Sequence, residues 1–203
     1  IVRAHRLKIR RFPAGSRTNQ TTSDYPSPCS PQLKYPTHLV GFVVTSPEGN
    51  LRLFDLSGFP LGSVGFLGDA PGQFNEPVDV LRDPFGAYFV TEGANIRRWQ
   101  RVDAFGRPLN TWAFDTPVAF NGSHMAWAPD GSILMTHSGR GTIIQFAPDG
   151  TMLEEWGILD TIDLNQPVGI FFDEVQSQLF ISDIGARVVH IFQADLIGEP
   201  PKP

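Results

Sequence analysis

Three side chains that can ligate metals stand at matching places in a repeated pattern. Glu92, His137 and Asp183 each end a short apolar run and precede a turn that contains glycine, in YFVTEG, ILMTHSG and LFISDIG. Thr45 ends an earlier run of the same kind. Carboxylate oxygens bind Ca²⁺, and carboxylate with imidazole binds Zn²⁺. If the fold brings the three residues together, they could hold a divalent cation.

A second interpretation of these residues needs no metal, and we favour it. Short polar side chains routinely accept hydrogen bonds from the backbone N–H groups of an adjacent tight turn. Each side chain would then serve its own turn. The neighbouring strands offer only Asp79 and His124 as further polar groups for a metal site. Both interpretations remain open on the sequence alone.

Other catalytic chemistry has little support in the sequence. No nucleophile elbow, P-loop or dinucleotide fingerprint occurs, and no Ser, His and Asp triad follows from spacing. The single Cys29 excludes a disulfide within the chain and lies among Pro and Ser residues. The sequence therefore favours a non-enzymatic protein with no resident cofactor, unless the divalent-metal hypothesis holds.

The elements that carry these residues repeat along the chain. A strand entry at Asn75 returns at Asn121 and Asn165, with steps of 46 and 44 residues. An aromatic residue closes a later strand in each unit, at Phe54, Trp99, Phe146 and Phe192. A period of about 20–50 residues is the signature of a solenoid, propeller or repeat array. Four units are therefore expected.

Each unit is predicted to consist of strands. In the third unit, apolar runs alternate with Pro-Asp-Gly turns at 129–131 and 148–150. Pro presets the first turn position, and Gly accepts the positive φ that follows. No stretch of about ten residues keeps a helical apolar period between caps. Four antiparallel strands per unit predict an all-β array of propeller blades.

The last unit resembles the NHL-repeat β-propellers. In PVGIFFDEVQSQLFISDIGARVVHIF, residues 167–192, Asp183, Gly185 and Arg187 fall on the family's Asp, Gly and Arg positions. The second unit has Glu92 in place of the Asp, and the third has His137. The resemblance covers residues 38–199 and implies a propeller fold. Calcium-dependent lactonase and amidating-lyase propellers are similar in fold, which implies the alternative of a divalent-metal-dependent lactonase-like or lyase-like enzyme.

The predicted organisation has an arm, an array and a tail. Residues 1–37 form a basic arm and a linker rich in Ser, Thr and Pro, and residues 200–203 form a Pro-rich tail. The expected blades are 38–74, 75–120, 121–164 and 165–199. We expect both end blades to be incomplete: the first lacks its innermost strand, and the last stops after three strands because a Pro-rich segment cannot supply N–H donors.

The charge of the chain is unevenly distributed. Residues 1–37 carry seven Lys and Arg residues against one Asp, a formal charge of +6. Because the net charge of the chain is −5, residues 38–203 carry −11. An acidic body repels phosphate, so nucleic acid is not an expected partner. No apolar run approaches the ~18 residues of a membrane-spanning helix. The basic residues alternate with apolar ones as in an edge strand, at Arg3, Arg6, Lys8, Arg10 and Arg11.

These features predict a scaffold module that binds protein through its open blade edges and its arm. Self-association into a homo-oligomer or filament is the expected outcome. Two acceptor sequons, at Asn19 and Asn121, predict surface glycosylation if the protein is secreted. An extracellular or periplasmic location is therefore expected.

Overall fold

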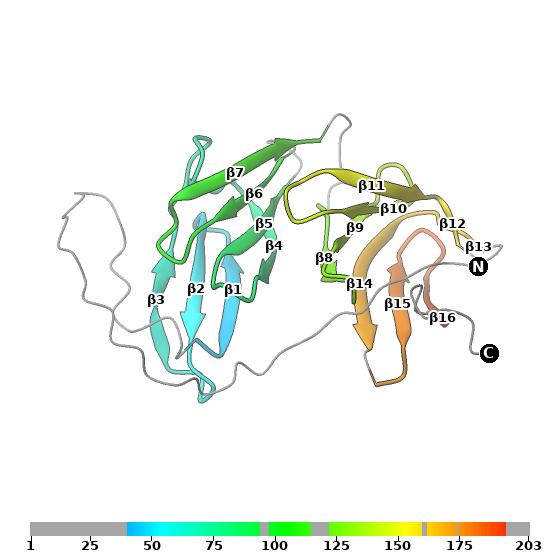
Figure 1. The fold of residues 1–203 in the computed structure, drawn as a ribbon, viewed down its shortest axis with the longest axis horizontal. Coiled ribbons are helices and arrows are strands. Elements are labelled where there is room, and N and C mark those ends of the chain that lie inside the picture. The colour runs from blue at the N-terminus through cyan, green and yellow to red at the C-terminus, as the bar shows by residue number, and fades with distance from the viewer. Residues whose placement is uncertain (1–39, 94–97, 115–121, 160–161, 174, 194–203) are drawn as a thin grey trace, which may run out of the picture. The chain divides into compact units, whose positions relative to one another are not determined.

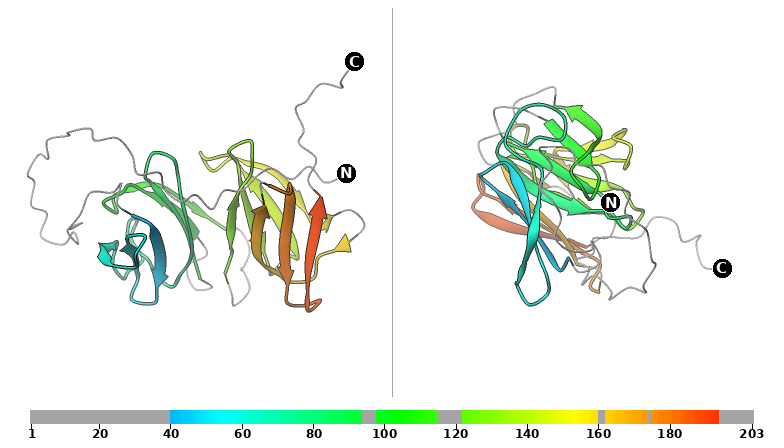
Figure 2. Two further views of the ribbon diagram at one scale, coloured as in Figure 1. Left: turned by 90° about the horizontal axis from the view of Figure 1, so that it is seen from below. Right: turned by 90° about the vertical axis from the view of Figure 1, so that its left-hand side faces the viewer.

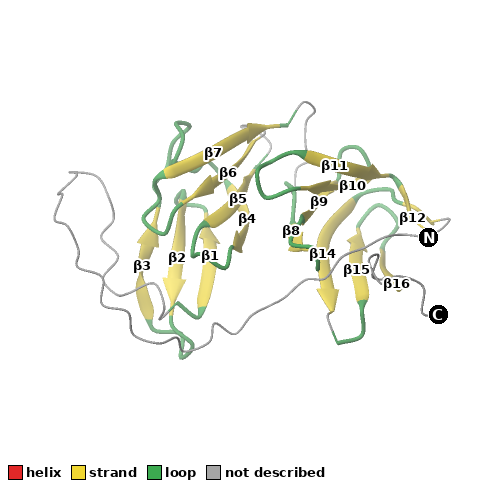
Figure 3. Ribbon diagram, in the orientation of Figure 1, coloured by secondary structure: helices red, strands yellow, loops and turns green. Residues whose placement is uncertain are grey.

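The computed structural model describes residues 40–93, 98–114, 122–159, 162–173 and 175–193 (Figure 1). Within these residues every regular element is a β-strand, as the colouring of Figure 3 makes clear. They include no helix long and apolar enough to cross a membrane. The basic arm with Arg3, Arg6, Lys8, Arg10 and Arg11, the sequon residues Asn19 and Asn121, and the Pro-rich tail lie outside the described residues.

The strands form four antiparallel sheets in which neighbours in the sheet are neighbours in the chain. The first sheet contains β1 (Phe42–Ser46), β2 (Asn50–Phe54) and β3 (Pro60–Val64). The second contains β4 (Pro77–Arg82), β5 (Tyr88–Glu92), β6 (Arg98–Val102) and β7 (Pro108–Ala113). The third contains β8 (Met125–Trp127), β9 (Ile133–His137), β10 (Thr142–Phe146) and β11 (Met152–Trp156). The fourth contains β14 (Pro167–Asp173), β15 (Gln178–Asp183) and β16 (Val188–Gln193).

A small ribbon of β12 (Ile158–Leu159) and β13 (Ile162–Asp163) follows β11. The four larger sheets are twisted, as the two further views in Figure 2 show. We number them blades 1 to 4. The all-β array of four blades is thus as the sequence predicts.

The end blades hold three strands each within the described residues. In blade 1, β1 takes the position that β5, β9 and β15 take in their blades. No described strand of blade 1 therefore corresponds to β4 of blade 2. Blade 4 has no described strand beyond β16, at the place that β11 takes in blade 3. The expectation of incomplete end blades is confirmed for this part of the chain.

Asp residues organise the turns between strands. In three turns the Asp carboxylate accepts hydrogen bonds from the N–H groups two and four residues later, at Asp55, Asp83 and Asp103. Asp130 accepts one from the Ser132 N–H. Gly131 then takes a φ of 82°, which glycine adopts without steric cost. The recurring Asp and Gly of the sequence therefore have a local structural cause.

The described chain divides into two compact units. One contains described residues 40–90 and 100–111, and its core packs blade 1 side chains such as Leu51 and Leu53 against Tyr88 and Val90 of blade 2. The other contains residues 91–93 and 98–99 and the described residues from 112 onward. Its core packs blade 3 against blade 4, and its buried apolar members are Ala126, Ala128, Leu134, Ile143, Leu159, Leu164, Phe172, Leu179, Ile181 and Phe192.

One equivalence expected from the sequence is wrong. Phe54 and Phe146 are the last residues of β2 and β10, whereas Trp99 is the second residue of β6. The ring centroids of Trp99 and Phe146 lie 5.0 Å apart, so these side chains pack against each other instead of occupying matching places. The step of 45 residues from Phe54 led to the wrong side of a strand because side chains alternate between faces.

Candidate functional site

We call β1, β5, β9 and β15 the second-position strands, because β5, β9 and β15 are second in their blades and β1 corresponds to them. Each of them ends in a buried polar residue: Ser46, Glu92, His137 and Asp183. The sequence had placed Thr45 in this set, and the structure corrects it to Ser46, the last residue of β1. Each of these residues precedes the turn into the following strand. Their positions decide whether they serve a shared ligand or their own turns.

The Glu92 carboxylate forms a buried ion pair within its own blade. Its two oxygens accept from the Arg98 guanidinium, with Nε–Oε1 at 2.6 Å and Nη2–Oε2 at 3.1 Å. The Glu92 side chain is fully buried and that of Arg98 is 9% exposed. A bidentate Arg–carboxylate pair satisfies both charges with fixed geometry. The carboxylate is therefore engaged by a cation of the protein itself.

His137 serves the turn that follows β9. Its Nδ1 accepts a hydrogen bond from the Arg140 N–H at 3.2 Å, and the Arg140 N–H also faces the His137 carbonyl at 3.1 Å. The edge of its ring meets the Phe114 ring, with centroids 6.1 Å apart. An imidazole nitrogen that accepts from a backbone N–H carries its proton on the other ring nitrogen. This arrangement fixes the ring in its pocket.

Asp183 holds two segments of blade 4 together. Its carboxylate accepts from the N–H groups of Asn165, Gln166 and Ala186 at 2.8, 2.9 and 3.0 Å. Burial acts to raise the pKa of Asp183, but the three N–H donors and the nearby His190 outweigh it and hold that pKa below its usual value. His190 Nε2 lies 3.6 Å from Asp183 Oδ2.

The candidate ligands do not form a metal-binding group. Among the described residues no three His, Cys, Asp or Glu side chains are placed to hold a metal ion, and Glu92, His137 and Asp183 are all described. Of the two further candidates, Asp79 accepts from the Val80 N–H. The backbone N–H of His124 donates to Thr136 Oγ1. The contacts are those expected if each strand-end residue serves its own blade.

A second polar series lies one residue earlier, and the sequence analysis missed it. Thr45 Oγ1 donates to the Val78 carbonyl at 3.2 Å, Thr91 Oγ1 to that of Ser123 at 2.6 Å, and Thr136 Oγ1 to that of Val168 at 2.7 Å. Each bond joins the second-position strand of one blade to the beginning of the next blade. The signal was a hydroxyl residue directly before each strand-end position.

Ser182 is the fourth member of this hydroxyl series. Its Oγ accepts from the Gly169 N–H at 2.8 Å, just as Thr136 Oγ1 accepts from the His124 N–H at 2.9 Å. Thr136 also donates to the following blade, but the Ser182 hydroxyl has no acceptor among the residues that the structure describes. Blade 4 therefore keeps the interblade donor without a following blade in the described chain.

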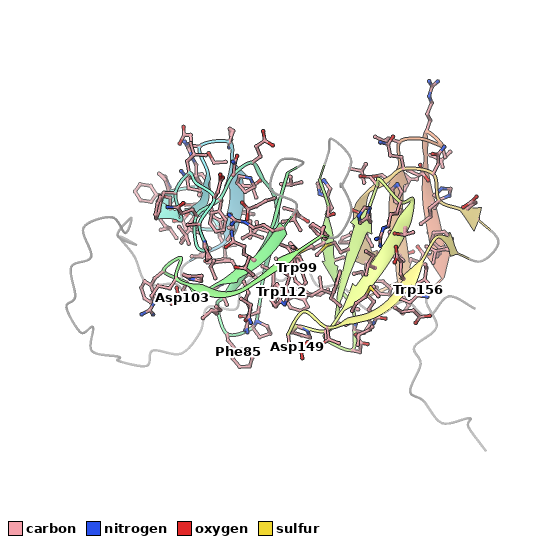
Figure 4. The ribbon with its side chains drawn as sticks, turned by 90° about the horizontal axis from the view of Figure 1, so that it is seen from above. Phe85, Trp99, Asp103, Trp112, Asp149 and Trp156 are labelled. Carbon is pink, nitrogen blue, oxygen red and sulfur yellow. The ribbon has the colours of Figure 1, made fainter. Side chains whose placement is uncertain are left out.

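Trp99 is buried, and the other three tryptophans are partly buried. The ring of Trp99 stacks on that of Trp112 with centroids 4.2 Å apart, and Figure 4 shows the two side chains together. Gly150 lies directly under the Trp112 indole, where a Cβ atom would clash with Nε1. Trp127 and Trp156 pack against the core shared by blades 3 and 4. The contacts of Trp99 with Phe146 and of Trp112 with Gly150 join blade 2 to blade 3.

Twisted antiparallel blades that repeat about every 46 residues define the fold class as a β-propeller. The structure resembles those of virginiamycin B lyase from Staphylococcus aureus. A selenomethionine-substituted form has 15% identity and a TM-score of 0.49, with 72% of this chain and 49% of that chain covered. A catalytically inactive form with quinupristin has 15% identity and a TM-score of 0.51, with 77% and 50% covered.

The likeness to virginiamycin B lyase extends to the fold alone at this identity. This chain spans about half the length of virginiamycin B lyase in the two structures. No protein-family model matches the sequence, and no curated protein matches it. The function is therefore argued from the chain's own residues.

Proposed function

We propose that the chain is a non-enzymatic module for protein assembly, built from NHL-type blades. It binds further copies through its open blade edges and its basic arm, in an extracellular or periplasmic setting. The observation that carries this proposal is that the end blades have three strands each in the part of the chain that the structure describes. Within the described residues, β1 and β16 each have a hydrogen-bonded neighbour on one side only. An open strand edge presents N–H and C=O groups that favour pairing.

The polar residues of the strand ends support an assembly role over catalysis. Glu92, His137 and Asp183 each accept hydrogen bonds from groups of their own blades. A divalent-metal-dependent lyase or lactonase would need these groups aimed at one ion. Metal analysis of the purified chain tests this alternative: a stoichiometric Ca²⁺ or Zn²⁺ that E92Q, H137Q and D183N remove would favour the enzyme.

Sedimentation of the intact chain and of a chain without residues 1–15 tests the assembly proposal. The +6 arm and the −11 body attract each other, and salt screens exposed charges over about 8 Å at physiological strength. We expect the intact chain to assemble at low salt. The mass of the assembly should fall at high salt, and the truncated chain should form smaller assemblies than the intact chain. A matched control replaces Arg3, Arg6, Lys8, Arg10 and Arg11 with Gln and keeps the length. Equal masses for all three proteins at both salt concentrations would contradict the role of the arm.

The proposed location has its own test. Asn19 lies in a stretch rich in Ser, Thr and Pro, and Asn121 lies in the sequence Asn-Gly-Ser. Secretion in an organism that glycosylates Asn predicts sugar on at least one of them. Intact mass of native protein checks this, and a bare polypeptide mass would remove the support for a glycosylated secreted form.

A further inference from the structure

The outer face of blade 4 carries a row of apolar side chains across its three strands. Across the three strands, Phe171 lies opposite Phe180, and Phe180 lies opposite Ile191. Directly opposed residues in a sheet share a face. Phe171 is 38% exposed and Ile191 is 57% exposed, and the neighbouring Val189 is exposed as well. Phe172, Leu179 and Ile181 point to the other side and belong to the core with blade 3.

The corresponding face of blade 3 is covered. Ala126 lies opposite Leu134, and Leu134 lies opposite Gln145, which is the same row of three one repeat earlier. All three residues are buried. Ala126 and Leu134 pack against blade 4 in the shared core. The row on blade 4 is thus an interblade surface whose covering blade is not among the described residues.

The outer face of blade 1 corresponds to the face that meets a preceding blade, whereas the outer face of blade 4 corresponds to the face that meets a following blade. Phe42 and Val44 alternate with the residues that face blade 2, and they are 51% and 50% exposed. Their counterparts one repeat later, Tyr88 and Val90, are fully buried against blade 1. A hollow of about 290 Å³ lies beside Phe42 and Val44 on blade 1. It is lined by Glu48, Asn50, Arg52, Phe54, Pro60, Gly62 and Ser63.

We infer that these two faces dock onto each other between copies of the chain. The outer face of blade 4 on one copy covers the outer face of blade 1 on the next, as blades 1 and 2 cover each other within the chain. The exposed Phe171, Val189 and Ile191 fill the side that carries Phe42, Val44 and the hollow. This contact rests on the proposed self-association but uses side-chain faces instead of strand edges.

The contact is heterologous because the two faces differ. Such contacts continue into rings or filaments, and each copy has one face of each kind. A lysine placed in either face blocks only that face. The variant V44K keeps its blade 4 face, and I191K keeps its blade 1 face. Two variants that each fail alone should therefore bind each other.

Sedimentation of V44K, I191K and their equimolar mixture tests the inference. Each variant alone should sediment as a single chain. Its apparent Kd for self-association should rise about 100-fold, because burying an unpaired ammonium is costly. The mixture should form a complex of two chains and no larger species. V175K is the matched control, since Val175 is 94% exposed in a turn between β14 and β15, and it should assemble as the unaltered chain does. F42K and V189K repeat the test if either first variant fails to fold.

The outcomes separate this inference from the proposed function. Assembly that V44K and I191K leave unchanged but arm truncation abolishes would overturn the face contact and leave the arm-driven proposal standing. A mixture that stays as single chains would also overturn the face contact. An unaltered chain that remains single at every concentration would overturn both.

Discussion

Removing the Glu92 carboxylate should destabilise the protein far more than a surface charge would. Arg98 is 9% exposed and Glu92 fully buried, and two short hydrogen bonds join them. E92A leaves a buried guanidinium without its carboxylate. Breaking a buried ion pair by deleting one partner costs about 3–5 kcal/mol, whereas an exposed pair is worth about 0–1 kcal/mol. We therefore expect a loss of about 3–5 kcal/mol in the free energy of unfolding.

The matched exposed pair in this chain is Arg52 with Glu48, at 2.6 Å and with side chains 48% and 65% exposed. E48A should change the stability far less than E92A does, because an exposed pair is screened by solvent. The double variant E92L/R98M should be more stable than E92A, because well-packed apolar residues can replace a buried ion pair at little cost. Urea unfolding followed by tryptophan fluorescence measures all four proteins, since the rings of Trp99 and Trp112 stack in the same unit.

The comparison would refute the reasoning in two ways. If E92A and E48A lost equal stability, burial would not determine the cost of breaking the pair. If E92L/R98M were no more stable than E92A, the loss would come from packing and not from the unpaired guanidinium. A metal role for Glu92 gives a third signature: added Ca²⁺ or Zn²⁺ would stabilise the unaltered chain and not E92A.

Three further predictions address the other contacts. T136V should lower the free energy of unfolding by about 1–3 kcal/mol because it orphans the His124 N–H and the Val168 carbonyl, whereas T136S should stay close to the unaltered chain; urea midpoints check this. D183N should be less stable at pH 7, and because the pKa of Asp183 is lowered in the folded state, the difference should shrink as the pH falls below ~4 through that folded pKa, which urea unfolding at several pH values measures. G150A should change the Trp112 fluorescence and lower the melting temperature, since its Cβ would meet the indole and its φ is 91°; G131A, with a φ of 82° but open space around it, controls for backbone strain.

The repeat, the strand content and the three-stranded end sheets of the described residues could be predicted from the sequence because each depends on local chemistry. Turn residues and apolar alternation determine where a strand begins and ends. The register was harder. The loop that follows the second-position strand differs in length between blades. It spans residues 47–49 between β1 and β2, and residues 93–97 between β5 and β6. Counting across such links displaced Trp99, and Thr45 was likewise placed one residue from Ser46.

The candidate site was harder to predict because it depends on which group each side chain meets. Sequence spacing correctly indicated that Glu92, His137 and Asp183 lie at matching strand ends. It did not indicate that Arg98 pairs with Glu92. Spacing also did not single out Thr91 and Thr136, because their hydroxyl groups bond across 32 residues to the next blade. Contacts between blades follow from packing, which periodicity alone does not specify.

The chemistry of the two polar series explains why one keeps its residue type and the other varies. A hydroxyl of the interblade series donates to the next blade, and at Thr136 it also accepts from its own blade; only Ser and Thr combine both roles in a short side chain. A strand-end residue needs only a local partner. Ser46 accepts from the Glu48 N–H, Glu92 pairs with Arg98, and His137 accepts from Arg140. Different side chains can satisfy different turns, whereas one shared ion would require them to point to a single place. The variety at the strand ends therefore supports local roles, and the hydroxyl bonds of Thr45, Thr91 and Thr136 support contacts between successive blades.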